Sequence, residues 1–492
     1  IILAVFTTNS FCLFFFLATI RFHGDLKILR LMRKPRKAIK RKFDPKSKKG
    51  AKKPSRHNVP DADEEDNESI ESDLEFQDVP DRSESEGEYE TAQEKKVRLA
   101  KKYLEEIKKE EQERNENKDL DDAAVLKRLK DDYLEQQGRL HKNVAAQCVL
   151  PAPGEVSTLR CKENRLSVTC LCVSSDGRFL YSGNKCSAIV KWSLPDKKKL
   201  RTICFKKNTD TGKKKFQCHK SPVAALTVSS DGKFLASCEE ANDIQIWSAD
   251  TLEHIHTFKG HRDHVTDLVF RKDSHQLYSA SKDRSVKVWS LDEMAYSETL
   301  FGHQAPITAI DALSRERAVT TGGRDCSLRV WKIAEESQLI FNGHSGSIDG
   351  VKLINEENFV SCGDDGSVCV WGSTKKKALC TAKVAHGRWE VAGGQEGEGE
   401  VRWISSVAAL LNTDLVASGS SDGMVRLWRL TPGCRAIEQV LEVPVPGFIN
   451  SLVFAPDGGT LIAGVGQEHR LARWWKIDNA KNAIYVIPIR KL

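Results

Sequence analysis

Histidine–aspartate pairs and a glycine-flanked serine are the residues of this 492-residue chain whose types and spacing could do chemistry. His261 with Asp283, and His303 with Asp325, have the composition of a catalytic imidazole–carboxylate pair. The run Gly419–Gly423 (GSSDG) matches the G-x-S-x-G turn that exposes a nucleophilic serine in hydrolases. Whether these residues are catalytic depends on the elements that hold them.

The fourteen cysteines do not have the spacing of a metal or redox site. The closest two, Cys170 and Cys172, are separated by one residue, and no C-x-x-C occurs. Several cysteines, Cys369 among them, fall inside apolar runs typical of strands. We therefore expect buried free thiols in a reducing compartment, with no metal and no cofactor.

A repeat of tryptophans organises the chain from about residue 155. The intervals between tryptophans that end β-rich runs are 55, 42, 42, 40, 57 and 46 residues, the spacing of WD repeats with four strands per blade. Three units open with Gly-His, and four carry an Asp six residues before the tryptophan. We predict an all-β, seven-bladed propeller over 155–492, in which residues 155–160 (EVSTLR) add a strand to the last blade and close the ring. The marker tryptophans are Trp192, Trp247, Trp289, Trp331, Trp371, Trp428 and Trp474/Trp475.

The repeat changes the interpretation of the histidine–aspartate pairs. In a propeller they are a hydrogen-bond network that holds each blade, and the Gly419–Gly423 turn lacks the strand–turn–helix context of a nucleophile. We therefore predict no enzymatic activity and no small-molecule substrate. Blades one and two are irregular, with Lys185-Cys186 and Ala241 where Asp is expected and Cys218-His219 opening blade two. The predicted network comprises His261, Asp283, Trp289, His303, Asp325, Trp331, His344, Asp365, Trp371, Asp422 and Trp428.

The segments before the propeller differ sharply in composition. Residues 1–20 carry no charge and are either a membrane anchor or translated sequence upstream of a start at Met32; we favour the second and set 1–31 aside. Residues 32–60 hold thirteen Lys/Arg and one acid, and 61–90 hold fifteen acids and one base, so we expect a disordered tail over 32–90. Residues 91–147 have helical periodicity with a thin apolar stripe, which predicts a helical arm. The stripe consists of Leu99, Tyr103, Ile107, Leu126, Leu129, Tyr133 and Leu140.

Positive charge is concentrated on blade one, although the whole chain is only +7. Residues 155–220 hold sixteen bases and five acids, which favours nucleic-acid binding over a merely solvated surface. A second set lies in blade turns and could contact a phosphate backbone. Two insertions, about 206–218 and 386–402, are expected as surface loops. The candidate RNA-binding residues are Lys197, Lys198, Lys199, Arg201, Lys206, Lys207, Lys213, Lys214 and Lys215 on blade one and its exit loop, and Lys282, Arg284, Arg324, His469 and Arg470 in the turns.

Several segments resemble the WD-repeat proteins of the U3 small nucleolar ribonucleoprotein over about residues 90–492. They are ETAQEKKVRLAKKYLEEI, GRDCSLRVWKIAEESQLIFNGHSGSID, WISSVAALLNTDLVASGS and GFINSLVFAPDGGTLIAGVGQEHRLARWWKI. The resemblance implies a non-catalytic protein of the nucleus and nucleolus that binds the box B/C region of U3 snoRNA. It also implies a small kink-turn-binding protein, other box C/D particle proteins and small-subunit processome proteins as partners in ribosomal RNA processing.

Two departures and two alternatives remain. The loop RWEVAGGQEGEGEVR is unusual for this family, and residues 1–20 have no counterpart in it. The first alternative is a protein-only WD-repeat scaffold whose propeller binds peptides. The second is a membrane-anchored WD-repeat protein, which requires that residues 1–20 span a bilayer; our expectation is no membrane association.

Overall fold

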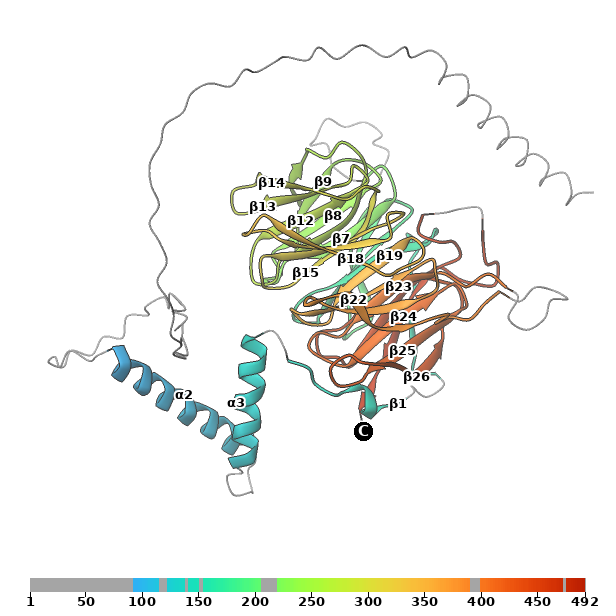
Figure 1. Ribbon diagram of the computed structural model, residues 1–492. Coiled ribbons are helices and arrows are strands. Elements are labelled where there is room, and N and C mark those ends of the chain that lie inside the picture. Colours follow the sequence, from blue (N-terminus) through green and yellow to red (C-terminus); the bar gives the residue numbers. More distant parts are fainter. Residues whose placement is uncertain are drawn as a thin grey trace, which may run out of the picture. The chain divides into compact units, whose positions relative to one another are not determined.

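Seven four-stranded antiparallel sheets form a ring in the computed structural model, which confirms the predicted seven-bladed propeller (Figure 1). The structure describes residues 92–114, 122–137, 140–149, 154–204, 219–389, 399–471 and 475–491. The first strand of each blade lies at the centre and the fourth at the rim. Strands one to four are β3 (Val168–Val173), β4 (Phe179–Asn184), β5 (Ile189–Ser193) and β6 (Lys198–Ile203) in blade 1; β7 (Val223–Val228), β8 (Phe234–Glu239), β9 (Ile244–Ser248) and β10 (His254–Phe258) in blade 2; β11 (Val265–Phe270), β12 (Gln276–Ser281), β13 (Ser285–Ser290) and β14 (Ala295–Phe301) in blade 3.

Blades 4 to 6 repeat this order. Short turns join consecutive strands within a blade, and a longer loop leads from each rim strand to the centre of the next blade. The strands are β15 (Ile307–Ala312), β16 (Arg317–Gly322), β17 (Ser327–Lys332) and β18 (Ser337–Asn342) in blade 4; β19 (Ile348–Leu353), β20 (Asn358–Gly363), β21 (Val368–Gly372) and β22 (Lys375–Ala382) in blade 5; β23 (Ile404–Ala409), β24 (Leu415–Ser420), β25 (Met424–Leu430) and β26 (Ile437–Pro444) in blade 6.

Blade 7 is built from both ends of the propeller. Its inner strands β27 (Phe448–Phe454), β28 (Thr460–Gly466) and β29 (Ala483–Pro488) come from the C-terminal side. Its rim strand β2 (Ser157–Leu159) comes from the segment predicted to close the ring, and Ser157 pairs with Val486. The strand β2 covers the outer edge of β29 and joins the N-terminal side of the propeller to its last blade, which closes the ring.

The core of the propeller lies between neighbouring blades. In blades 1 to 6 the tryptophan near the end of the third strand packs against the preceding blade: Trp289 of blade 3 clusters with Ile244 and Phe258 of blade 2, and its ring stacks on Phe258 at 4.9 Å. Trp247 clusters in the same way with Tyr181 of blade 1. Each of these indoles is almost fully buried, so truncation to alanine is expected to cost about 3–5 kcal/mol.

The prediction that Trp474 or Trp475 ends a strand of blade 7 is wrong. The third strand is β29, where Ile487 lies opposite Leu461, the register position that Trp289 occupies opposite Leu277 in blade 3. Trp475 lies in the loop between β28 and β29, and Trp474 is outside the described residues. The Trp475 ring packs on Trp389 of the loop before blade 6, with centroids 4.6 Å apart. Trp475 therefore makes a contact between two loops and is not the tryptophan of a repeat.

Two helices occupy the predicted arm. α2 (Ala92–Arg114) and α3 (Asp122–Gln136) contact one another, and Tyr103 donates a hydrogen bond to Asp132 at 2.8 Å. Ile107 and Val125 are buried, whereas Leu126 and Tyr133 are exposed, so only part of the predicted stripe is covered. Across the described parts of the chain, no helix combines the length and apolar character that a bilayer crossing needs.

The segment 140–149, which we call the strap, ties the arm to the propeller. Asp414, in the turn between β23 and β24, accepts hydrogen bonds from the backbone N–H groups of Val144 and Ala145 at 2.7 and 2.9 Å. Leu140 and Ala145 are buried, and Ala145 belongs to the core cluster of blades 6 and 7. The strap ends in β1 (Cys148–Val149), which pairs with β30 (Arg490–Lys491) beside the C-terminus (Figure 1). The arm therefore ends on a fixed, well-bonded segment.

Candidate nucleic-acid interface

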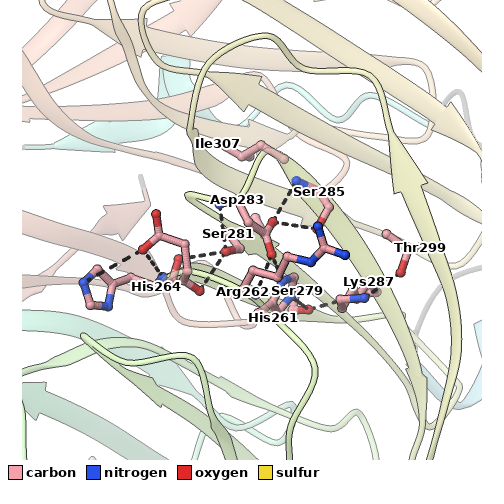
Figure 2. Close-up of polar contacts among 12 residues, drawn as sticks. His261, Arg262, His264, Ser279, Ser281, Asp283, Ser285, Lys287, Thr299 and Ile307 are labelled. Atoms are coloured by element: carbon pink, nitrogen blue, oxygen red, sulfur yellow. Dashed lines mark hydrogen bonds and ion pairs between the residues drawn. The ribbon is translucent and has the colours of Figure 1, made fainter.

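In blade 3 the predicted network is a continuous chain of hydrogen bonds (Figure 2). His261 Nδ1 lies 2.9 Å from Asp283 Oδ2, and His261 Nε2 lies 2.7 Å from Ser279 Oγ. The Trp289 indole N–H donates to the same Ser279 oxygen at 2.9 Å. This chain joins the loop before the blade to its second and third strands. We call the end of the propeller that carries these contacts the histidine end.

Blades 4, 5 and 6 repeat the chain. In blade 6 the imidazole is His386, which lies 2.8 Å from both Asp422 Oδ2 and Ser418 Oγ. Sequence reasoning missed His386, because it stands 36 residues before its aspartate, beyond an insertion, and the preceding residue is Ala385 rather than glycine. The other members are His303, Asp325, Thr320 and Trp331 in blade 4, and His344, Asp365, Ser361 and Trp371 in blade 5.

The irregular blades use other groups at the same place. In blade 2, His219 Nδ1 lies 3.6 Å from Glu239 Oε2. Glu239, on β8, therefore takes the place of the aspartate, whose repeat position is occupied by Ala241. Blade 1 lacks the histidine, and Asn184 Oδ1 instead accepts from the backbone of Cys186 and Ala188 at 3.0 Å each. Sequence spacing could not show either replacement, because neither residue lies at the repeat position of the aspartate.

The electrostatics of the network are those of a structural element. Burial alone would raise the pKa of Asp283, but hydrogen bonds from His261 and Ser285 outweigh it and hold this pKa well below the usual range. Both ring nitrogens of His261 are engaged and the residue is buried, so no nitrogen is free to take a proton from a substrate. The G-x-S-x-G match begins at the end of β24 and covers the turn that leads into β25. It therefore lies in a strand–turn–strand unit.

The basic residues of blade 1 lie on its rim strand. Lys198, Lys199 and Arg201 are on β6, and Lys197 is in the turn before it; all four are exposed. Lys199 is bound to Glu163 at 2.7 Å, and Arg201 donates to the Thr251 carbonyl at 2.8 Å. Within the described residues Lys197 and Lys198 make no ion pair, so of these four residues they are the cations most available to an anion. Lys206, Lys207, Lys213, Lys214 and Lys215 lie outside the described residues.

The turn residues fall into two groups. Lys282 and Arg284 in blade 3 and Arg324 in blade 4 are exposed at the histidine end, on either side of the buried network aspartates. His469 is only 8% exposed, its ring packs at a tilt on Trp403 with centroids 5.0 Å apart, and its pKa is lowered to about 3 by burial and by nearby Arg470 and Lys185. This buried, neutral imidazole offers no positive charge to a phosphate.

Arg470 and three aspartates, Asp267, Asp311 and Asp349, line the central channel, a cavity of about 310 Å³ bounded by the inner strands. Arg470 reaches from blade 7 to blade 5 and donates to the Asp349 carbonyl at 3.0 Å. Asp267 and Asp311 each accept the backbone N–H of the next inner strand, from Ile310 at 3.0 Å and Leu353 at 2.7 Å. These contacts fasten neighbouring blades around the channel. In the described residues no group of three metal-ligating side chains could hold a metal ion.

Comparison with known proteins agrees with this architecture. The profile of the WD domain, G-beta repeat family matches residues 154–193, 211–248, 252–290, 295–332, 335–372 and 396–429. The chain is 53% identical to U3 small nucleolar RNA-interacting protein 2 of Mus musculus over 82% of this chain and 83% of that protein, and 52% identical to the Homo sapiens protein over the same shares. A crystal structure of RRP9 WD40 repeats superposes with a TM-score of 0.66 at 50% identity, covering 70% of this chain and 100% of the other.

Proposed function

The chain belongs to the family of U3 small nucleolar RNA-interacting WD-repeat proteins, and from this premise we propose that it is a non-catalytic, RNA-binding scaffold of the U3 ribonucleoprotein. It binds the box B/C region of U3 snoRNA within the small-subunit processome, in the nucleolus, and supports ribosomal RNA processing. The observation that carries the RNA contact is the exposed basic rim of blade 1, where Lys197 and Lys198 have no ion-pair partner among the described residues.

The chemistry of this surface suits a folded RNA. Duplex RNA has a narrow major groove that hides base edges, so a protein recognises it by backbone shape and phosphate position. Lysines along one rim strand give a row of cations on a rigid sheet, and each phosphate neutralised releases counterions and adds affinity. The propeller thus positions charge without rearrangement. It brings no reacting group to the RNA, because the histidines of the blades are committed to the network.

The arm supplies the surface for protein partners in this proposal. Leu126 and Tyr133 of α3 are 67% and 59% exposed, although a helix pair would be expected to bury such side chains. The strap fixes the end of the arm on blade 6. We assign the exposed apolar side chains to contacts with the kink-turn-binding protein, other box C/D particle proteins and processome proteins.

The test is ultraviolet crosslinking and sequencing of RNA bound to the endogenous protein. We expect reads concentrated on the box B/C region of U3 snoRNA, and crosslinked peptides from β6 rather than from β22. The strand β22 is a matched control because Lys375, Lys376 and Lys377 are equally exposed on the rim of blade 5. Reads at background level would contradict the RNA-binding proposal.

The exposed apolar side chains of the arm also favour one alternative, a scaffold that binds proteins only. The two functions differ in their response to ribonuclease. A protein-only scaffold keeps its partners after RNA is digested, whereas an RNA-dependent assembly loses those that are held through U3 snoRNA.

A further inference from the structure

Phe301 is the most exposed large hydrophobic side chain in the described part of the chain, at 73%. It is the last residue of β14 and pairs with Ser285 of β13, so it lies at the outer corner of blade 3, at the histidine end. No ring of another described aromatic residue packs on it. A single exposed apolar side chain needs no explanation by itself. Its surroundings give this one significance.

The neighbours of Phe301 at this corner are cationic. Arg284 immediately precedes Ser285, the residue paired with Phe301, and Lys282 lies two residues further back in the same turn. Arg284 has a φ of +69°, and its N–H donates to the Ser281 carbonyl at 3.2 Å, so the turn has a defined shape. Both side chains are exposed, and within the described residues neither makes an ion pair. Their positive charge therefore faces solvent.

The acids nearby are already engaged. Asp283, between the two cations, is bound to His261 at 2.9 Å and to the Ser285 hydroxyl at 2.6 Å. Asp263, in the preceding loop, accepts the His264 backbone N–H at 2.7 Å. The backbone N–H of Arg262 is also bound to Asp283, at 3.1 Å, and its exposed guanidinium adds a third cation to this end of the blade (Figure 2). The corner thus combines a free aromatic face with three exposed cations, Arg262, Lys282 and Arg284, which outnumber the two nearby carboxylates, Asp263 and Asp283.

We propose that this corner is a stacking site for an unpaired nucleotide of the bound RNA. The base lies on the Phe301 ring, and the flanking phosphates contact Arg284 and Lys282. Aromatic rings interleaved with cations are the arrangement that binds single-stranded nucleic acid, because every base has a π face and every linkage a negative charge. The inference rests on the proposed RNA binding and adds a second, base-contacting surface to the backbone contacts of blade 1.

Charge complementarity favours RNA over a protein segment as the occupant. A nucleotide satisfies both the aromatic face and the two cations with one chemical unit. A peptide would need an apolar and an acidic side chain at the same spacing. The network below the turn is buried and fully bonded, so the site is formed before the ligand arrives.

The experiment measures binding of two RNAs to the full chain by fluorescence anisotropy at several salt concentrations. One RNA is a U3 box B/C fragment with its unpaired nucleotides, and the other is the same fragment with complements added so that it is fully paired. Phe301→Ala is expected to weaken binding of the first RNA about 5- to 160-fold and to leave its salt slope unchanged, because the variant loses a stacking contact but no charge. Binding of the paired RNA should not change.

Matched variants complete the test. Phe301→Trp should retain affinity, and Ile340→Ala, an exposed apolar truncation on the rim of blade 4, should have no effect. Arg284→Ala should lower the salt slope. Equal binding of wild type and Phe301→Ala would overturn the stacking site and leave the proposed RNA-binding function standing. If, after ribonuclease treatment, Phe301→Ala loses a protein partner that the wild type keeps, Phe301 contacts a protein, and the stacking site is also overturned. No binding of either RNA by the wild type would reject both proposals.

Discussion

The two unpaired lysines of blade 1 allow a quantitative prediction. Replacing Lys197 and Lys198 by glutamine removes two exposed cations without disturbing β6, because their side chains make no hydrogen bond or ion pair within the described residues. Each phosphate contact contributes about 0.9 to the slope of log affinity against log salt on a duplex and about 0.7 on a single strand. The double variant should therefore have a slope smaller in magnitude by about 1.4–1.8.

The smaller slope of log affinity against log salt can be measured in a salt titration. Between 50 and 200 mM salt, the wild type should lose roughly tenfold more affinity than the double variant. Lys199→Gln should have a smaller effect, because Glu163 at 2.7 Å already compensates that cation. Lys375→Gln with Lys376→Gln on β22 is the matched control, with the same charge change on another rim strand. Identical slopes for the Lys197/Lys198 variant and wild type would refute the assignment of phosphate contacts to blade 1.

Three further predictions concern stability. Ser279→Ala deprives a buried indole and a buried imidazole of their shared partner and should lower the free energy of unfolding by about 2–4 kcal/mol in denaturant titrations; a change as small as that of an exposed serine would contradict the structural role of the network. Hydrogen bonds to Asp292 and Asp231 outweigh burial and raise the pKa of His275, so its stabilisation is complete below the ordinary value of 6.5 and is lost as pH rises through the higher folded value. His275→Gln should thus lower the melting temperature more at pH 5.5 than at pH 8.5, and an equal loss at both would be inconsistent with a charged imidazole. Asp414→Ala leaves two N–H groups of the strap without an acceptor and should increase proteolysis near residues 140–149 while the propeller still folds, whereas an unchanged cleavage pattern would argue against the strap contact.

The sequence predicted the parts of the fold that repeat. Tryptophans spaced 40 to 57 residues apart located six blades correctly, since an indole fills the same space between each of these blades and the one before it. The closing strand was also predicted, because a ring with an open edge is unstable in water. The prediction of a strand-ending tryptophan in blade 7 was wrong, because Ile487 occupies that position and Trp475 packs on Trp389 of another loop.

The candidate site was less accessible to sequence reasoning. An insertion hid His386 from its aspartate, and Glu239 replaced an aspartate from a different strand position. Arg470 and His469 looked like exposed turn residues, yet one spans the channel and the other is buried against Trp403. Phe301 had no signal at all, because a phenylalanine at the end of a strand is normally core. The exposure of a side chain depends on packing between segments that are distant in the sequence, so a local sequence pattern cannot predict it.

The closure of blade 7 sets the order of events during synthesis. Ser157 pairs with Val486, so the rim strand is translated 329 residues before its partner. At about 5–20 residues per second, the ribosome takes roughly 15–65 s to translate the intervening chain. During that time six blades can form their sheets, but the ring stays open and β2 has no partner. The ring therefore closes only after β29 has been translated, and any product that ends before β29 exposes the face of blade 1 that packs on blade 7 to cellular quality control.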